Sequence, residues 1–175
     1  MTNDCRIDMN LRLPFRWDCI EPARQSVIAV ATAALSDKLL AERMGIAVSE
    51  LLENAIKHGR EHDIWLTLKE SAGRLVARVR NAIHPGTEST AALSSRLEWM
   101  AGYADPRDAY LAAMTAVYEQ TDPSASSSQS TLGLVRIAHE GNCRIECDLS
   151  EPGYVTMNAS QPIGAIDQGN AGRAC

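Results

Sequence analysis

The chain has 175 residues, a formal net charge of −5 and 45% hydrophobic residues, which is typical of one soluble domain with a single core. The acidity argues against a nucleic-acid partner, because proteins that bind nucleic acids usually carry a basic stripe. No stretch approaches the roughly 18 consecutive apolar residues of a membrane span. The first ten residues, MTNDCRIDMN, lack the basic and then apolar order of a signal peptide. We therefore expect a cytoplasmic protein with reduced cysteines.

The first half of the chain predicts a strand, two helices and a hairpin. Residues 10–17, NLRLPFRW, alternate between apolar and polar, and Pro14 favours an edge position for this strand. A long, alanine-rich helix is expected from Glu21, and a second helix from about Leu39 to His58 that ends at Gly59. The segments DIWLTLKE (63–70) and RLVARVRN (74–81) then alternate as two strands joined by a short turn.

The second half predicts a helical insert and a closing hairpin. After the loop AIHPGTEST (82–90), helices are expected over 92–103 and 106–120, so that residues 88–120 form an inserted helical segment. The segment TDPSASSSQST (121–131) is expected to be a flexible serine-rich loop, followed by a short helix over 132–141. The segments 143–149 and 154–160 alternate as a hairpin, and the tail from 161 to 175 is expected to be disordered.

This order of elements predicts the fold class. Strands that adjoin in hairpins favour a mixed, mostly antiparallel sheet, and the few helices suffice to cover one of its faces. We therefore expect an α+β two-layer sandwich, formed as a single domain over residues 1–160.

The helix expected over residues 39–58 carries an unusual polar side. At ~100° per residue, Glu50, Asn54 and Lys57 fall within a narrow sector. One interpretation is the solvated face of an ordinary amphipathic helix. The other is a magnesium and phosphate site, because Mg²⁺ prefers oxygen ligands and an amide oxygen with phosphates and water can hold it. Glu50 would then orient a hydroxyl for attack, and Lys57 and His58 would supply positive charge near the phosphates.

The segment AVSELLENAIKHG (47–59) resembles the N-box of the GHKL superfamily of ATPases and kinases, which includes gyrase, Hsp90, histidine kinases and MutL. Within that superfamily it is most similar to the serine/threonine protein kinases that act as anti-sigma factors in bacterial partner switching. The expected order of elements over about residues 10–159 is also that of the family. The helical insert is similar to a subgroup of partner-switch kinases from biofilm- and aggregation-regulating operons. The resemblance implies a Bergerat-type sandwich whose insert acts as a lid and partner surface.

The resemblance implies roles for individual residues. Glu50 matches the general base, Asn54 the magnesium ligand and Lys57 a position beside the phosphates. Where the family reads adenine with D-x-G-x-G, this chain has NAIHPG (81–86), so Asn81 replaces the aspartate and Gly86 is the candidate for a later glycine. The glycine-rich phosphate loop corresponds to QSTLGL (129–134), whose candidate nucleotide-binding residues are Ser130, Thr131, Leu132, Gly133 and Leu134.

Two functions follow from this resemblance. The first is a protein kinase that binds ATP and Mg²⁺ and phosphorylates a small STAS-domain anti-anti-sigma protein, with a PP2C-type phosphatase as a further candidate of the same pathway and a homodimer as a compatible assembly. The second is a catalytically silent binding module with the same fold, which the departures at Asn81 and in the glycine-poor loop favour. A phosphatase-like or two-component accessory role is a third and weaker hypothesis.

Overall fold

The computed structural model describes residues 7–84, 88–119 and 126–164. Its strands are β1 (Asp8–Leu13), β2 (Ile64–Ser71), β3 (Arg74–Ala82), β4 (Arg144–Asp148) and β5 (Tyr154–Pro162). Its helices are the short 3-10 helix η1 (Trp17–Cys19), α1 (Ile20–Leu35), α2 (Lys38–His58), α3 (Glu88–Ala101), α4 (Pro106–Glu119) and α5 (Ser126–His139). Within these residues no helix is both long and apolar enough to cross a membrane.

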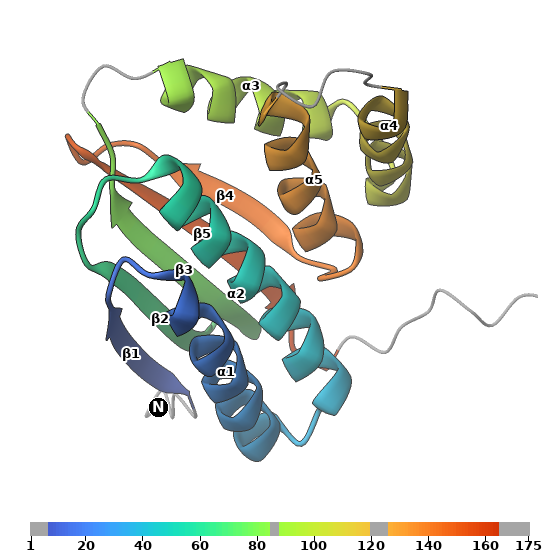
Figure 1. The fold of residues 1–175 in the computed structure, drawn as a ribbon. Coiled ribbons are helices and arrows are strands. Elements are labelled where there is room, and N and C mark those ends of the chain that lie inside the picture. Colours follow the sequence, from blue (N-terminus) through green and yellow to red (C-terminus); the bar gives the residue numbers. More distant parts are fainter. Residues whose placement is uncertain (1–6, 85–87, 120–125, 165–175) are drawn as a thin grey trace, which may run out of the picture.

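The strands form one sheet in the order β1-β2-β3-β5-β4, with α1, α2 and α5 in front of one face (Figure 1). The expected α+β two-layer sandwich is therefore confirmed. All four strand pairings of the described sheet are antiparallel, so the mixed sheet that we expected is wrong in that detail. The reason is that β3 and β5, which are distant in sequence, also run in opposite directions.

The edge strand β1 is shorter than the alternation of residues 10–17 predicts. It begins at Asp8 and ends at Leu13, immediately before Pro14, and it pairs with β2 alone. A proline has no N–H to donate to a strand ladder, which explains why the strand ends there. The predicted edge position is confirmed.

The break between α1 and α2 is set by local chemistry. Ser36 adopts a left-handed conformation with φ 55°, which ends α1. One residue later, the side chain of Asp37 accepts a hydrogen bond from the backbone N–H of Leu40 at 2.9 Å and caps α2. The two helices then lie side by side, and α2 buries its apolar face against the sheet (Figure 1).

Both hairpins form as the sequence predicts. The β2–β3 turn contains Ala72 (φ 49°) and Gly73 (φ 71°), the pair of positive φ angles typical of a tight two-residue hairpin. In the closing hairpin, β5 extends to Pro162, and Gln161 is only 3% exposed. The expected disordered tail from 161 is therefore wrong for its first residues, because they continue the ladder with β3; residues 165–175 lie outside the described part of the chain.

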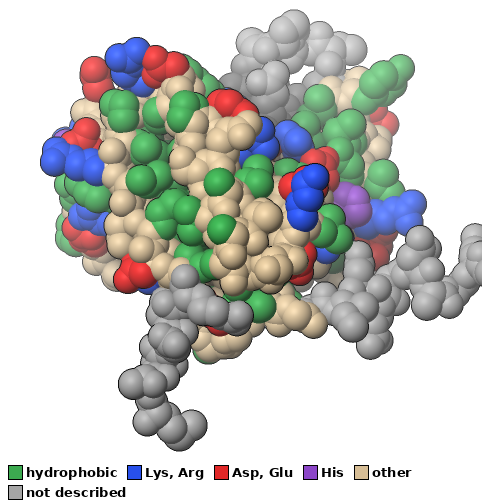
Figure 2. Space-filling view, turned by 90° about the horizontal axis from the view of Figure 1, so that it is seen from below, with side chains coloured by type: hydrophobic (Ala, Val, Ile, Leu, Met, Phe, Trp, Pro, Cys, Tyr) green, Lys and Arg blue, Asp and Glu red, His purple; other side chains and the backbone are tan. Residues whose placement is uncertain are grey.

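The helical insert packs on α5. Helices α3 and α4 form close to their expected bounds, and α4 packs through Ala109 and Ala113 against Val135 of α5. Its opposite side leaves Leu111, Met114 and Tyr118 exposed, and hydrophobic side chains stand out at the right-hand edge of Figure 2, where α4 lies.

Helix α5 is longer than expected. It begins at Ser126, so residues 126–131, which we expected in a flexible loop, are helical. The remainder of that expected loop, residues 121–125, lies outside the described residues. The segment QSTLGL (129–134) therefore lies in the middle of α5 and is not a loop that precedes the helix.

Candidate functional site

The polar residues of α2 differ in their exposure to solvent. Glu50 is only 8% exposed, Asn54 is partly buried, and Lys57 and His58 near the end of the helix are exposed. A solvated face does not account for this pattern, because a charged side chain is rarely buried without a partner. Glu50 therefore needs a specific explanation.

The carboxylate of Glu50 is enclosed by α5. Its Oε1 accepts a hydrogen bond from Nη1 of Arg136 at 2.5 Å, and a Cβ added to Gly133 would lie 2.7 Å from Oε2. Burial raises the pKa of Glu50, while the positive charge of Arg136 acts in the opposite direction. Arg136 also donates to Oε2 of Glu140 through Nε (3.2 Å) and Nη2 (3.1 Å), so one guanidinium joins both carboxylates.

Sequence reasoning missed Arg136. Its spacing of four residues from Glu140 is an ordinary helical pair. Its second partner, Glu50, is 86 residues away in the chain, and nothing in the local pattern indicates that contact. Gly133 carries the one available signal, since a glycine inside a helix often marks a close approach of another group.

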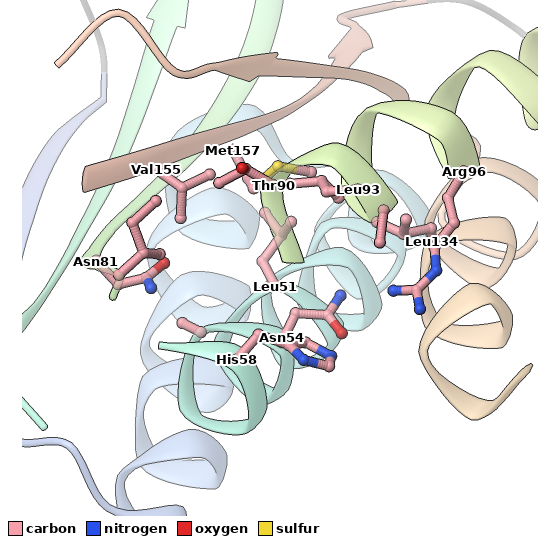
Figure 3. Close-up of a pocket in the computed structure, with 13 residues that line it drawn as sticks. Leu51, Asn54, His58, Asn81, Thr90, Leu93, Arg96, Leu134, Val155 and Met157 are labelled. Atoms are coloured by element: carbon pink, nitrogen blue, oxygen red, sulfur yellow. The ribbon is translucent and has the colours of Figure 1, made fainter. Parts of the chain in front are cut away.

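A pocket of about 100 Å³ lies beside α2 and under α3 (Figure 3). This volume is well above the ~10–15 Å³ that one water molecule needs and below the roughly 300–1,000 Å³ of typical small-molecule pockets, so it can admit part of a larger ligand. It brings together four of the predicted residues, which are Asn54, His58, Asn81 and Leu134. Its other lining residues are Leu51, Ala55, Ile83, Thr90, Ala92, Leu93, Arg96, Val155 and Met157. The lining is mostly apolar with a few polar groups, as is usual for small-molecule sites.

Asn81 has a structural role at the end of β3 as well as a place in the pocket wall. It is 3% exposed, and its Nδ2 donates to the backbone oxygen of Ala82 at 3.1 Å. The same Nδ2 would lie 2.8 Å from a Cβ at Gly59, so the end of α2 is packed closely against it. Since a carboxamide also carries an acceptor oxygen, Asn81 can still accept a hydrogen bond from a ligand.

Three polar side chains converge at the other end of the pocket. Asn54 and His58 come from α2, and Arg96 reaches toward them from α3 (Figure 3). Although part of the His58 side chain is exposed, its partial burial in the pocket wall lowers its pKa, and the positive charges of Arg96 and Lys57 lower it further. Burial also lowers the pKa of Arg96. Sequence reasoning missed Arg96, because only the fold brings α3 over α2.

Lys57 is directed away from this pocket. Its Nζ lies 3.0 Å from Oε2 of Glu53 and 5.8 Å from the centre of the Trp17 ring. It is absent from the residues that line the pocket. The structure therefore places Lys57 outside the pocket that Asn54 lines, and its role beside the phosphates stays a prediction.

The predicted phosphate loop is helical in the structure. Interior amides of an α-helix are hydrogen bonded to the carbonyl four residues earlier, so the N–H groups around Gly133 are occupied within α5. Leu132 packs with the insert and Leu134 is fully buried. The side chains of Ser130 and Thr131, and all of Gly86, lie outside the described part of the structure. The loop geometry expected over 129–134 is wrong.

The site offers limited ligation for a metal ion. The described residues contain no group of three or more His, Cys, Asp or Glu side chains that could hold a metal. Asn54 alone supplies an amide oxygen to the pocket from α2. One such oxygen fits Mg²⁺ when phosphates and water complete its shell, and it does not fit a metal held by protein ligands alone.

Comparisons with known proteins support the fold but do not assign the chain to a family. No family model and no curated protein sequence matches the chain. Among solved structures, a chain of the SiaB–SiaC complex from Pseudomonas aeruginosa is similar, with a TM-score of 0.64 and 13% identity over 87% of this chain and 88% of that chain. At this identity the likeness establishes a shared fold over nearly the whole length.

Proposed function

We propose that this chain is a Mg·ATP-dependent serine/threonine protein kinase that acts as an anti-sigma-like regulator by phosphorylating a small STAS-type partner. The observation that carries the proposal is the pocket, in which Asn54 from α2 and Asn81 from β3 face the same cavity under α3. These are the two positions that the GHKL resemblance assigns to magnesium and to adenine. The similar fold of a chain crystallised in a complex of two proteins supports a protein partner.

Different residues of the pocket would contact different parts of the nucleotide. The apolar side chains Leu51, Val155 and Met157 would contact a purine ring, and the Asn81 oxygen would accept from its amino group. Asn54 would hold Mg²⁺, which neutralises charge on the phosphates when it is bound. In the transfer, the γ-phosphoryl group passes from ATP to a serine or threonine oxygen of the partner, ADP leaves, and Glu50 takes the hydroxyl proton.

The raised pKa of Glu50 suits a proton acceptor, but its present contacts do not. Both carboxylate oxygens lie against α5, one at Arg136 and the other at Gly133, and Glu50 does not line the pocket. Phosphoryl transfer therefore requires α5 to move relative to α2. Helix α5 is the element that would form the glycine-poor phosphate loop by unwinding at its beginning.

These same contacts favour a second candidate function. If α5 stays helical and Arg136 stays bound to Glu50, the chain is a binding module that sequesters its partner without phosphoryl transfer. The kinase is preferred because a silent module has no need for Asn54 at the polar end of a pocket, whereas a nucleotide site does.

The experiment uses the intact chain and the STAS-domain protein encoded nearest to it in the genome. The two are incubated with Mg·ATP, and intact-mass spectrometry measures a gain of one phosphate on the partner. If the chain is a kinase, the wild type should transfer phosphate to the partner. Glu50→Gln should lose this transfer and still bind the nucleotide. Asn54→Ala should lose both the transfer and the nucleotide binding. Glu53→Gln, on the same helix but paired with Lys57, is the matched control and should transfer normally.

Two results would contradict the kinase. Partner binding without ATP and without any phosphate gain indicates the silent module. Full phosphate transfer by Glu50→Gln would show that Glu50 is not the base, even if the chain is a kinase.

A further inference from the structure

One turn of α5 lies over both of the predicted reactive residues of α2. A Cβ added to Gly133 would be 2.7 Å from Oε2 of Glu50 and 3.7 Å from Nδ2 of Asn54. The glycine lets α5 approach the two side chains this closely, since it carries no side chain of its own. Glu50 is buried behind this turn and does not line the pocket. Its carboxylate is therefore shielded from a partner's hydroxyl group while α5 stays in this position.

The guanidinium of Arg136 holds α5 in this position. Its Nη1 donates a hydrogen bond to Oε1 of Glu50 at 2.5 Å. A hydrogen bond between two charged groups is roughly twice as strong as one between neutral groups. One carboxylate oxygen is thus engaged as an acceptor, and the other faces Gly133. The contact stabilises a closed state in which Glu50 is not available as a base.

The same guanidinium has a second partner at the end of its own helix. Its Nε and Nη2 donate to Oε2 of Glu140 at 3.2 and 3.1 Å, and Glu140 is only four residues further along the chain. If α5 moves away from α2, Arg136 loses Glu50 but keeps Glu140. Because the arginine stays paired, this movement costs less than one that leaves its charge without a carboxylate.

The helical insert packs against the same end of α5 (Figure 1). The ring of Tyr110 on α4 lies 5.0 Å from the ring of His139, which is next to Glu140 in the chain. Val135, the neighbour of Arg136, is buried against α4. A displacement of the insert would therefore be transmitted to the contact between Arg136 and Glu50.

We propose that the contact between Arg136 and Glu50 is an autoinhibitory latch, which keeps the base unavailable until α5 moves away from α2 and Arg136 remains with Glu140. This inference rests on the proposed kinase function and adds the way in which that function is restrained. Arg136 is a positioning residue, because it acts through Glu50 and does not line the pocket. The latch also stabilises the fold, so removing it should increase activity at the expense of stability.

The test measures phosphate transfer by variants of the intact chain at saturating Mg·ATP. The partner is the STAS-domain protein encoded nearest in the genome, and intact-mass spectrometry gives the initial rate. Arg136→Gln should raise this rate roughly 5- to 50-fold, within the range of about 5- to 150-fold that is typical of conformational coupling. Arg136→Lys, which keeps the charge but not the planar fork, should raise it less. Glu140→Gln should lower it, since opening would leave the arginine without its partner on α5.

Arg24→Gln is the matched control, because it removes an exposed ion pair with Glu21 on α1. It should transfer phosphate at the wild-type rate. Damage to the fold would lower the rate, so a gain in Arg136→Gln is not explained by a merely structural role. If Arg136→Gln fails to fold, Arg136→Lys carries the comparison.

A second measurement does not depend on kinase activity. Amide hydrogen exchange over residues 132–139 of α5 is followed without nucleotide or partner, with the amides of β2 as the internal reference. The ratio of exchange in α5 to exchange in β2 should rise in Arg136→Gln and stay unchanged in Arg24→Gln. Global unfolding would raise both rates together, so the ratio reports the local opening of α5.

The outcomes separate the latch from the proposed function. Transfer by Arg136→Gln at or below the wild-type rate overturns the latch and leaves the kinase standing. A higher rate in Glu140→Gln contradicts the part given to Glu140. No transfer by any variant, with faster exchange of α5 in Arg136→Gln, overturns the kinase and supports the closure of α5 by Arg136. No transfer with unchanged exchange overturns both.

Discussion

Replacing Arg136 by glutamine removes the positive partner of a buried carboxylate. Glu50 has a side chain that is 10% exposed, whereas that of Arg136 is 40% exposed. Removing one partner of a fully buried ion pair costs roughly 3–5 kcal/mol, and exposed pairs contribute about 0–1 kcal/mol. Because this pair is intermediate, Arg136→Gln should lower the free energy of unfolding by about 2 kcal/mol at neutral pH. For a chain of this size that is a fall of roughly 4–8 °C in Tm.

The effect of Arg136→Gln should depend on pH in a defined direction. The pKa of Glu50 is raised above its ordinary value of 4.5, so the folded chain binds this proton more tightly than the unfolded chain does. The contribution of Glu50 to stability therefore decreases as the pH rises from 4.5 through the folded pKa. Loss of Arg136 raises that pKa further, so the destabilisation should be largest at neutral pH and should shrink on acidification as Glu50 becomes protonated.

A double-mutant cycle measured by urea unfolding checks this reasoning. Arg136→Gln is made in the wild type and in Glu50→Gln, and both are followed from pH 8 toward pH 5. The coupling between the two substitutions should be about 1–3 kcal/mol at neutral pH. Arg24→Gln, which removes an exposed pair with Glu21 on α1, is the matched control and should cost under about 1 kcal/mol. Equal costs for Arg136→Gln in both backgrounds would refute the account of this pair.

Three further substitutions test individual contacts of the fold. For each, urea unfolding measures the change in the free energy of unfolding, whose sign the structure predicts. Gly133→Ala should gain about 1 kcal/mol of helix propensity but lose more through the contact with Glu50, so it should destabilise the wild type and stabilise Glu50→Ala; the same sign in both contradicts the contact. Asp37→Ala removes the cap of α2 and should cost about 1 kcal/mol, whereas no change would indicate that the cap is not formed. Leu66→Ala opens the core under α2 and should cost about 2–5 kcal/mol, while Leu111→Ala on the exposed side of α4 should stay within about 0.5 kcal/mol.

The sequence predicts the elements of this fold well because their signals are local. The alternation in residues 63–70 and 74–81, and the alanine-rich run after Pro22, each specify one element without reference to the rest of the chain. Two of the errors of extent also have local causes. Pro14 ended β1 early, and the serine-rich segment after 125 joined α5, since serine is a tolerable helix former when its neighbours pack.

The site was predicted less completely because it depends on long-range contacts. The helical spacing and the resemblance singled out Asn54, which the structure places in the wall of one pocket together with Asn81, while their roles as magnesium and adenine ligands stay predictions. The orientation of Lys57 depends on Glu53 and the Trp17 ring, which no pattern in α2 reveals. Arg96 and Arg136 are important only because α3 and α5 fold back over α2, so their roles follow from the tertiary structure alone.

The central claim is that the pocket beside Asn54 binds Mg·ATP. The most direct test is the Tm of the intact chain with and without millimolar Mg·ATP, for the wild type and for Asn54→Ala. A ligand at 100 times its Kd stabilises a protein by about 2.7 kcal/mol, so the account predicts a rise of roughly 5–10 °C in the wild type. It predicts little or no rise in Asn54→Ala. A wild type whose Tm does not change, or an Asn54→Ala variant that responds equally, would contradict the claim.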